Sequence, residues 1–586
     1  MKFILQLGAI SAAVSMCSFV TADDADISIT YSPRISLIST VTPAKVMRRE
    51  EIERINANSL SELLKTLAVF SVYSTGGEGQ KSNIRAFGLE DEQILILVNG
   101  SPLNSATEGE TQLEWLDINT IESIEYFGLG QGVIFGSGSA GGVINIVTTG
   151  SLKNLVKLGV ASNNTIKSSI QLSSDSDGNL LSISLHGKRT SGVDVREGSQ
   201  TDNDAFQHYS SNFSYKPSDG FIESFTATKS VSDVEIDDDW SAQNNVESSV
   251  DSFNVKYGSL VQGLVEGEYS LSIVKTEAYT DDKSSVNIYK TVNNTANLFT
   301  QLGASRVGVE VSNQKYKPGG TAYYSATNSS NLAALLGAYE TSISDKAIIG
   351  TTLRIEQHDE FGFEKAFNVS LTRYLGETSK AGITASHSYR YPSLADRFGS
   401  GAYTKALSPE TVNTISASYS LDDAKHQFSV EIFSARMNDT LYWSGSTQNI
   451  GTNLSHGMNI DLKLTRDLWR HHLGYSYVFS HLKFYSDREM PFTPEHSLTY
   501  QVDRSLENGS LFLKSSYQTE MLGGYSGSAK TTAYGMFDVG LKQTLMGINF
   551  VLDCKNCGDR NLELISSGTK YFSGGRTFAL EAQLEF

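Results

Sequence analysis

The end of the chain alternates strictly between two kinds of side chain. Five apolar residues occupy every second position: Phe578, Leu580, Ala582, Leu584 and Phe586. Between them stand Ala579, Glu581, Gln583 and Glu585. A period of two is that of a β-strand with one face in an apolar medium, and about ten such residues cross a bilayer when the strand is tilted. A soluble sandwich could contain one such strand, but its place at the chain end, finishing on an aromatic residue, favours a membrane β-barrel.

The same alternation recurs from about residue 151 onward. Clear examples are residues 181–185, 367–371 and 498–502, and turn-forming segments such as 176–179 and 217–220 separate the runs. A bilayer would solvate one face of each strand, while the other face would line a lumen. Closure into a barrel would leave no unpaired edge in lipid. The sequence therefore predicts an all-β membrane domain over residues 151–586.

Composition excludes two other classes. The chain has 47 Lys and Arg against 65 Asp and Glu, a net charge of −18. This acidity argues against a nucleic-acid-binding protein. The mean hydropathy of −0.22 argues against a helical transporter, whose several apolar spans of roughly 20 residues would raise it.

The first 22 residues have the pattern of a cleavable export signal. Lys2 precedes an apolar run, and small residues end at Ala22. The alternative is a buried N-terminal helix. No later stretch is long and apolar enough to span as a helix, so we expect an exported protein.

Residues 23–150 show a different, α+β pattern. Residues 46–67 carry helical spacing, and Ser59 or Ser61 is a candidate cap for the second half. Residues 93–98 predict a strand that runs into the turn dipeptide Asn99-Gly100, and residues 143–147 predict another strand. We expect a small domain packed against the barrel.

Several ordered motifs in this domain resemble the plug of TonB-dependent outer-membrane transporters. They are residues 83–88 (NIRAFG), 93–100 (QILILVNG), 121–125 (IESIE) and 135–146 (FGSGSAGGVINI). The resemblance continues in the barrel at residues 389–394 and 407–410, and at 575–586.

This resemblance implies a 22-stranded antiparallel outer-membrane β-barrel with an N-terminal α+β plug in its lumen. The strand number comes from the family and not from the periodicity. The implied division is a signal peptide (1–22), a periplasmic segment with a TonB box (23–40), a plug (41–150) and the barrel (151–586).

Within the family, the chain is most similar to the cobalamin-transporting members. Residues 26–30 resemble their TonB box, with Asp26, Ile27, Ser28, Ile29 and Thr30. An extended segment of this kind can add as a strand to the sheet edge of a partner, here TonB. Taken alone, the five residues could equally be a frayed terminus.

The acidic segments at residues 192–206 and 237–240 resemble calcium-binding external loops of the same members. The candidate ligands are Asp194, Asp202, Asp204, Asp238 and Asp239. Ca²⁺ requires six to eight oxygen ligands, which carboxylates supply. The alternative is a solvated acidic loop without metal.

Polar residues in two plug loops match the family's substrate-facing positions: Gln80, Ser82, Asn104, Ser105 and Thr107. Each could also be an ordinary turn residue. The chain departs from the family at Ala86, at Ala68-Val69 and at residues 128–130, where Gly-Leu-Gly replaces a charged segment.

Cys554 and Cys557 form a lone C-x-x-C pair. No second pair completes a zinc site, so we expect a local disulfide in the oxidising envelope. We find no nucleophile with a base, no phosphate loop and no paired catalytic carboxylates, and therefore expect a protein that is not an enzyme.

These observations and the resemblance predict active uptake of a large scarce nutrient, which we expect to be cobalamin, by a monomer in the outer-membrane lipid. One alternative keeps the machinery but changes the cargo to a ferric siderophore or haem. Another class of alternative is a passive channel or a barrel-anchored adhesin. The plug motifs argue against the channel, because an open pore has no use for a packed domain of this size.

Overall fold

A computed structural model describes residues 45–105, 109–111, 113–148, 153–196, 203–237, 244–258, 265–280, 283–321, 327–398, 407–443, 447–483, 487–525, 529–566 and 569–586. The predicted export signal and the predicted TonB box lie outside these residues. Among the helices of the described part, none is both long enough and apolar enough to cross a membrane.

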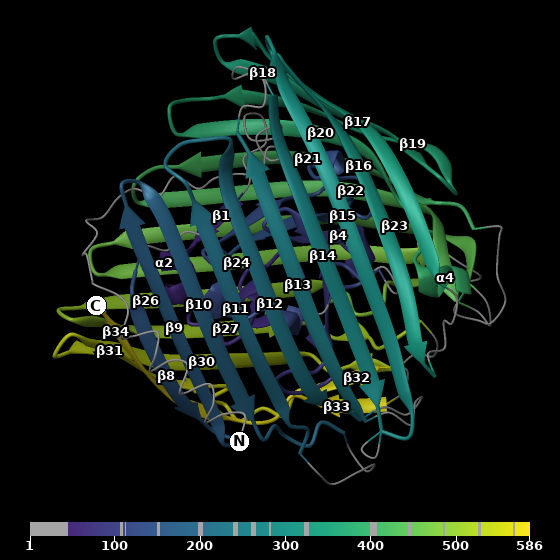
Figure 1. The fold of residues 1–586 in the computed structure, drawn as a ribbon. Helices are drawn as coiled ribbons and strands as arrows, with labels where there is room; N and C mark the ends of the chain where they lie inside the picture. Colours follow the sequence, from purple (N-terminus) through teal and green to yellow (C-terminus); the bar gives the residue numbers. More distant parts are fainter. Residues whose placement is uncertain are drawn as a thin grey trace.

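Twenty-two antiparallel strands close into a barrel, as the resemblance implied. Figure 1 shows the strands as a continuous wall that passes from teal to yellow. The first nine wall strands are β8 Leu155–Ala161, β9 Thr165–Ser176, β10 Asn179–Thr190, β11 Phe206–Lys216, β12 Ile222–Glu235, β13 Asn245–Tyr257, β14 Val265–Tyr279, β15 Val286–Leu302 and β16 Ser305–Gly320. The next eight are β17 Asn328–Ser344, β18 Ala347–His358, β19 Gly362–Tyr374, β20 Ser379–Arg390, β21 Glu410–Asp422, β22 His426–Trp443, β23 Thr447–Arg466 and β24 Trp469–Lys483. The wall ends with β25 Asp487–Glu489, β26 His496–Leu506, β27 Gly509–Gln518, β30 Tyr534–Leu545, β31 Ile548–Lys555 and β34 Thr577–Glu585.

Two features complete the wall. Strands β25 and β26 pair with successive parts of β24, so together they form one interrupted barrel strand. The last strand, β34, pairs with the first, β8, from Ala579 opposite Ala161 to Glu585 opposite Leu155. This pairing leaves no free strand edge, whose backbone N–H and C=O groups would have no hydrogen-bond partner in lipid.

The predicted alternation of the last strand is confirmed. Phe578, Leu580 and Leu584 are 54%, 46% and 44% exposed on the outside, whereas Ala579 and Glu581 are each 8% exposed and face the lumen. Similar outward-facing apolar residues recur around the wall, among them Leu335, Ile383, Ile432 and Leu552. They form the lipid-facing surface of the barrel.

The two rims of the barrel differ. Both ends of the barrel chain and tight connections such as 177–178, 345–346 and 546–547 lie at one rim. Longer connections, such as 191–205, 391–409 and 556–576, lie at the other. Short turns are typical of the periplasmic side and longer loops of the outside, which sets the orientation. The short strands β28 Met521–Leu522, β29 Lys530–Thr531, β32 Glu563–Ser566 and β33 Thr569–Phe572, with helix α4 Leu394–Phe398, belong to the external connections.

The plug occupies the lumen, where it is drawn in purple behind the wall (Figure 1). Its main sheet has the order β1-β6-β7-β4-β5, with β4 and β7 parallel. The strands are β1 Lys45–Arg48, β4 Ile94–Val98, β5 Ser101–Pro102, β6 Ser123–Phe127 and β7 Gly142–Val147. The remaining elements are α2 Arg49–Ile55, α3 Leu60–Lys65, the hairpin of β2 Phe70–Ser74 with β3 Ser82–Ala86, and the 3-10 turns η2 Asp91–Gln93, η3 Leu113–Trp115, η4 Ile118–Thr120 and η5 Val133–Phe135.

Local sequence explains these elements. Ser59 caps α3 by accepting a hydrogen bond of 3.2 Å from the backbone N–H of Glu62. Asn99 and Gly100 both have positive φ, 50° and 86°, as the tight turn between β4 and β5 requires. The strand and turn predictions for the plug are confirmed. The helical prediction for residues 46–67 holds for α2 and α3, but residues 46–48 belong to β1, where they pair with β6.

The plug has an apolar core that extends to the wall. Leu60, Leu63, Ile96 and Ile144 are almost fully buried in it. Wall residues from β13, β14, β21 and β22 join the same cluster: Val250, Val274, Val412, Phe433, Ala435 and Met437. Because burial of this surface is shared between plug and wall, the two parts pack as one unit.

Candidate functional site

The first plug loop is held against the external rim of the barrel. The side-chain amide of Gln80 donates a hydrogen bond of 2.6 Å to the carbonyl of Glu235, at the end of β12. The Glu235 carboxylate in turn accepts from the backbone N–H of Ala205 at 2.9 Å. Gln80, predicted as a substrate contact, therefore links the plug to two wall connections.

Glycines allow the same loop to approach the wall closely. A Cβ on Gly79, which has φ +86°, would lie 2.2 Å from the ring of Phe206, and one on Gly76 would lie 2.5 Å from Val195. Any larger residue would push the loop away from the segment 191–206. The plug loop and this external segment are consequently one packed surface.

Three carboxylates converge beside that surface. Oxygen atoms of Asp194, Asp204 and Asp237 all lie within 4.8 Å of one another. One oxygen of Asp204 accepts from the N–H of Val195 at 3.0 Å, and one of Asp194 accepts from that of Arg196 at 3.1 Å. Their hard oxygen atoms are the donor type that Ca²⁺ prefers.

This group differs from the predicted ligand set in one respect. It brings Asp194 and Asp204 together with Asp237, which the sequence analysis passed over in favour of its neighbours. The predicted ligands Asp202, Asp238 and Asp239 lie outside the described residues. Asp237 is the first residue of the acidic run 237–239, and this run was the sequence feature that could have marked it as a candidate ligand.

The other predicted substrate residues lie in the plug. The amide of Asn104 is committed to backbone: it accepts from the N–H of Ile96 at 2.9 Å and donates to the carbonyls of Ile94 and Gly109. Ser82 is 3% exposed, and the backbone of Ser105 closes the turn to Glu110. Thr107 lies outside the described residues. Substrate contact by these residues stays a prediction.

Next to this turn lies a network of polar and charged side chains around the buried Asp91. Asn83 donates to Asp91 at 2.5 Å, Lys81 pairs with Glu110, and Arg85 pairs with Glu90 at 3.4 Å. Burial, reinforced by the nearby Glu110 carboxylate, raises the pKa of Asp91 to about 7 despite Arg85.

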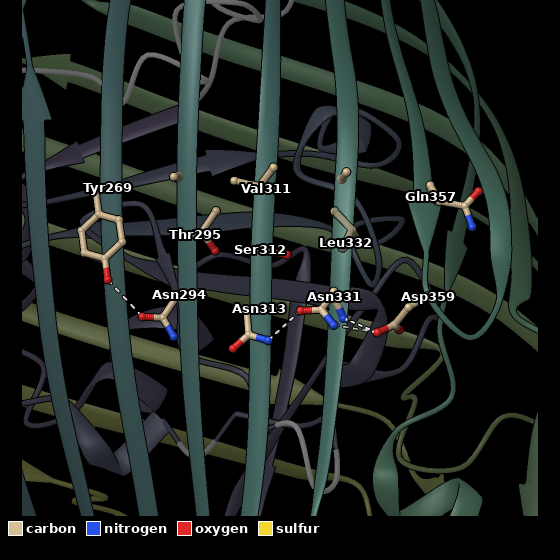
Figure 2. A pocket seen from close by; sticks show the side chains of 12 residues that line it. Tyr269, Asn294, Thr295, Val311, Ser312, Asn313, Asn331, Leu332, Gln357 and Asp359 are labelled. Carbon is tan, nitrogen blue, oxygen red and sulfur yellow. Dashed lines mark hydrogen bonds between the residues drawn. The ribbon is translucent and has the colours of Figure 1, made fainter.

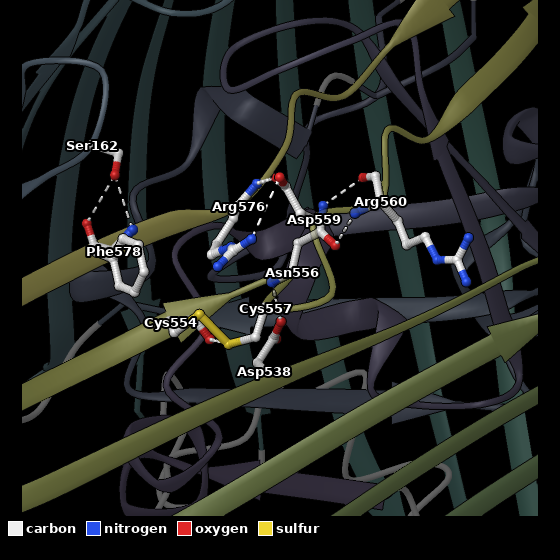
Figure 3. Close-up of a disulfide and its surroundings, with 9 residues drawn as sticks. All are labelled: Ser162, Asp538, Cys554, Asn556, Cys557, Asp559, Arg560, Arg576 and Phe578. Carbon is white, nitrogen blue, oxygen red and sulfur yellow. Dashed lines mark hydrogen bonds and ion pairs between the residues drawn. A yellow bond between two sulfur atoms is a disulfide. The ribbon is translucent and has the colours of Figure 1, made fainter.

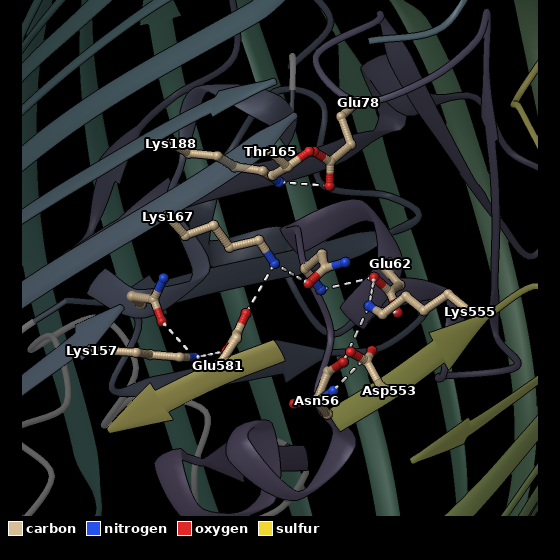
Figure 4. Close-up of polar contacts among 12 residues, drawn as sticks. Asn56, Glu62, Glu78, Lys157, Thr165, Lys167, Lys188, Asp553, Lys555 and Glu581 are labelled. Atoms are coloured by element: carbon tan, nitrogen blue, oxygen red, sulfur yellow. Dashed lines mark hydrogen bonds and ion pairs between the residues drawn. The ribbon is translucent and has the colours of Figure 1, made fainter. Parts of the chain in front are cut away.

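Lysines from the wall secure one side of the plug (Figure 4). Lys555 contacts the Glu62 carboxylate at 2.6 Å, Lys188 contacts Glu78 at 2.7 Å, and Lys167 contacts Asn58 at 2.6 Å. Although burial raises the pKa of Glu62, the ammonium groups of Lys555 and Lys514 lower it to about 2. Glu62 is therefore ionised, and its ion pair with Lys555 holds α3 of the plug to the barrel wall.

Wall lysines also donate hydrogen bonds to the backbone carbonyls at the C-terminal end of α2. Lys542 donates to the carbonyls of Glu53 and Arg54, and Lys514 and Lys555 donate to that of Asn56. Cations are favourable at a helix C-terminus because its last carbonyls are unpaired within the helix. Sequence reasoning missed these lysines, since their partners are hundreds of positions away.

On another side of the plug, an arginine of the wall binds the plug backbone. Arg354 on β18 is 1% exposed, pairs with Glu310 at 2.8 Å and with Glu356 at 2.5 Å, and donates to the carbonyl of Ile134 at 3.1 Å. The nearby Gly-Leu-Gly segment carries no charge, and Asn368 of the wall binds its backbone at the Gly130 carbonyl. Wall side chains thus bind the plug backbone at both Gly130 and Ile134.

The structure joins Cys554 to Cys557 by a disulfide at the start of an external connection (Figure 3). Asp559 and Arg576 form an ion pair at 3.5 Å, and Asp559 also accepts from the N–H of Arg576. These contacts close the base of the connection between β31 and β34.

Comparison with known proteins identifies the family. A family model described as TonB-dependent Receptor Plug Domain matches residues 36–143, and one described as TonB dependent receptor-like, beta-barrel matches residues 157–556. The chain belongs to the TonB-dependent receptor family. As a TonB-dependent receptor with a closed 22-stranded barrel, it is an outer-membrane protein.

Curated relatives of this receptor include several called Vitamin B12 transporter BtuB. The protein from Vibrio vulnificus is 26% identical over 401 residues, 64% of this chain and 63% of that protein. The one from Photobacterium profundum is 34% identical over 110 residues, 19% of this chain and 18% of that protein. The alignments span less than two thirds of the length of these relatives.

Solved structures share the fold of the receptor at low identity. The siderophore receptor PirA from Acinetobacter baumannii has a TM-score of 0.78 at 14% identity and covers 95% of this chain and 100% of its own. The copper transporter OprC has a TM-score of 0.77 at 13% identity, with coverage of 93% and 98%. A siderophore receptor and a copper transporter share this fold, so the fold does not identify the ligand.

Proposed function

We propose that this receptor takes up cobalamin actively across the outer membrane, driven by TonB acting on residues 26–30. The observation that carries the proposal is a plug packed inside a closed barrel and tied to its wall. A lumen filled in this way suits gated transport, because passage requires the plug to move or rearrange. It does not suit a passive channel.

Cobalamin is proposed as the cargo because the curated relatives are vitamin B12 transporters and because the chain shares motifs with cobalamin-transporting members. Asp26, Ile27, Ser28, Ile29 and Thr30 are proposed to pair with TonB as an added strand. The barrel has no energy source of its own, so a partner coupled to the inner membrane supplies the work.

We further propose that Asp194, Asp204 and Asp237 hold a calcium ion. Their three carboxylates fit a hard divalent cation, and the nearby predicted ligands Asp202, Asp238 and Asp239 would add oxygens. Bound calcium would fix the segment 194–204 and hence the surface formed by Val195 and Phe206 against the plug loop.

Binding of cyanocobalamin to the detergent-solubilised protein tests cargo and metal together. Tight binding that weakens on calcium chelation supports both assignments. Binding that ignores chelation keeps the cargo and rejects the metal site. Absence of binding in both conditions rejects cobalamin, and ferric chelates and haem are then titrated in the same assay.

A further inference from the structure

Six lysines line one side of the barrel lumen. They stand on neighbouring strands of the wall: Lys514 on β27, Lys542 on β30, Lys555 on β31, Lys157 on β8, Lys167 on β9 and Lys188 on β10. Lys157 and Lys542 lie near the periplasmic ends of their strands, Lys514 lies in the middle of its strand, and the other three lie near the external ends. The lysines therefore form a series from the external side to the periplasmic side, which we call the lysine wall.

Plug groups are the partners of most of these lysines. Lys555 contacts the Glu62 carboxylate at 2.6 Å, and Lys188 contacts that of Glu78 at 2.7 Å (Figure 4). Three other lysines donate to the plug between residues 53 and 58, to backbone carbonyls or to a side-chain amide. When the plug moves away, the lysine wall loses these partners.

The plug segment that covers the lysine wall is also close to the proposed point of force. Helices α2 and α3 are the first helices of the plug and follow directly after β1. A pull on residues 26–30 passes through residues 45–62 before it reaches the rest of the plug. We therefore expect the contacts of α2 and α3 to break early, which would free Lys514, Lys542 and Lys555.

The wall does not neutralise these lysines by itself. Glu581 already pairs with both Lys157 and Lys167, at 2.7 Å and 3.0 Å. Lys167 and Lys188 are direct register partners on β9 and β10, where like charges repel. The six lysines outnumber the wall carboxylates on the same side of the lumen, which are Asp503, Asp538, Asp553 and Glu581. Without the plug carboxylates, this side of the lumen carries a net positive charge that attracts anions.

Another part of the wall has a different lining. Strands β16 and β17 carry amide groups on their outer face, where Asn313 donates to Asn331 at 2.8 Å (Figure 2). The buried lumen positions of β15 include Asn293, Thr295 and Asn297. Neutral groups of this kind do not attract an anion as lysines do, so the charge of the lumen favours passage along the lysine wall.

We propose that the lysine wall carries the anionic group of the cargo through the lumen. The proposal rests on cobalamin uptake as the proposed function, and it concerns the phosphodiester in the nucleotide part of that cargo. The plug carboxylates occupy the lysines at rest, and the phosphodiester replaces them during passage. Ammonium groups form charge-assisted hydrogen bonds with phosphate, and the flexible lysine side chains can pass the group from one to the next.

The test compares uptake of cobalamin with uptake of cobinamide, a corrinoid without the phosphate-bearing nucleotide, in cells that carry the full-length receptor. The variant K167Q/K514Q removes two charges of the lysine wall and keeps the pair of Lys555 with Glu62. We expect its initial uptake rate of cobalamin, divided by that of cobinamide, to fall about tenfold, the effect of one charge-assisted hydrogen bond. The charge-preserving variant K167R/K514R should keep the wild-type ratio.

Two control variants separate this role from plug anchoring. Glu62→Gln breaks the anchor from the plug side and leaves every lysine in place, so the ratio should stay that of the wild type. K346Q/K425Q removes two lysines from periplasmic turns and should also keep the ratio. Because both cargoes are measured on the same cells, the ratio does not depend on the amount of folded receptor.

Several results would overturn the proposal. They are an unchanged ratio in K167Q/K514Q, an equal fall in the uptake of both corrinoids, and a matching fall of the ratio in Glu62→Gln. If the wild type takes up cobalamin but no cobinamide, equal cobalamin uptake by K167Q/K514Q and K167R/K514R would overturn it. A wild type that accumulates neither corrinoid would reject cobalamin uptake itself, and this proposal would fall with it.

Discussion

The guanidinium of Arg354, on barrel strand β18, donates a hydrogen bond of 3.1 Å to the carbonyl oxygen of Ile134 in the plug. The same group is flanked by Glu310 and Glu356. A Cβ on Gly136 would lie 2.9 Å from this guanidinium, so the plug backbone is shaped to receive it. The contact joins the plug to the barrel wall.

Replacing Arg354 should loosen the plug. Arg354→Met leaves two buried carboxylates without their cation, which costs about 3–5 kcal/mol when a buried pair is broken. We expect the plug to unfold inside the barrel at a lower urea concentration, measured as the onset of conductance across a planar bilayer. Arg373→Met, at the exposed end of β19, is the matched control and should keep the wild-type onset. An unchanged onset in the Arg354 variant contradicts the role of this contact.

The pair Glu62–Lys555 should make a measurable contribution to plug anchoring. A double-mutant cycle with Glu62→Gln and Lys555→Gln isolates their coupling, which we expect at about 1.5–3 kcal/mol for hydrogen-bonded charges. The readout is again the urea dependence of plug unfolding. Coupling indistinguishable from zero would show that the contact contributes nothing.

The same anchor predicts an acid dependence. The pKa of Glu62 is lowered in the folded state to about 2, from an ordinary value of 4.5. A lowered carboxyl pKa stabilises the fold above the ordinary value, and this stability is lost as the pH falls through that range toward 2. The wild-type plug should therefore lose stability between about pH 5 and 2 by more than Glu62→Gln does. Parallel pH profiles of the two proteins would rule this out.

Sequence patterns predict the fold well and the plug contacts poorly. Alternation such as that of residues 578–586 specifies a strand and its lipid face, because the period is local. The family motifs supply the strand number and the plug. Lys555 and Glu62 are 493 residues apart, and neither has a neighbouring pattern that marks it. Long-range pairs of this kind become visible only when the barrel is closed.

The candidate site shows the same limit. An acidic segment predicts where carboxylates gather, and Asp194 and Asp204 do lie together. It cannot tell which Asp of the run 237–239 turns toward them, because that depends on the path of the chain after β12. Sequence also could not show the role of Asn104. It reads as a polar loop residue, but its side-chain amide binds three backbone groups.

Asp91 should titrate near neutral pH. Burial and the Glu110 carboxylate raise its pKa to about 7, so the folded state favours the protonated acid. A raised carboxyl pKa penalises the fold increasingly as the pH rises from the ordinary value of 3.8 to about 7. Infrared difference spectra should show protonated carboxyl absorption lost on titration to pH 8. Asp91→Asn should reduce this signal, while Glu114 and Glu122, whose pKa burial also raises to about 7, supply the rest.

Asp117 provides the control for Asp91. Burial would raise its pKa, but His186, His208 and the amide of Asn119 lower it to about 2. Asp117→Asn should therefore leave the infrared band near neutral pH unchanged. A reduced signal in Asp117→Asn, or an undiminished signal in Asp91→Asn, would contradict the assignment.

Asp237 should contribute to calcium affinity as a direct ligand of the proposed site. Asp237→Asn removes one charged ligand from the proposed site and should weaken calcium binding, measured by isothermal titration. Asp177→Asn, in a periplasmic turn, removes the same charge far from the site and should have no effect. Equal calcium affinity in the two variants would argue that the carboxylates form only a solvated loop.

Energised uptake tests the central proposal most directly. Cells carrying the wild type, a deletion of residues 26–30, Ile29→Pro or Ile29→Val are given radiolabelled cyanocobalamin. A proline cannot donate the backbone hydrogen bond of an added strand, whereas valine preserves it. We predict that the deletion and the proline variant bind cobalamin at the surface but accumulate none, while the valine variant accumulates it normally. Full accumulation by the deletion variant would contradict TonB-driven transport by this receptor.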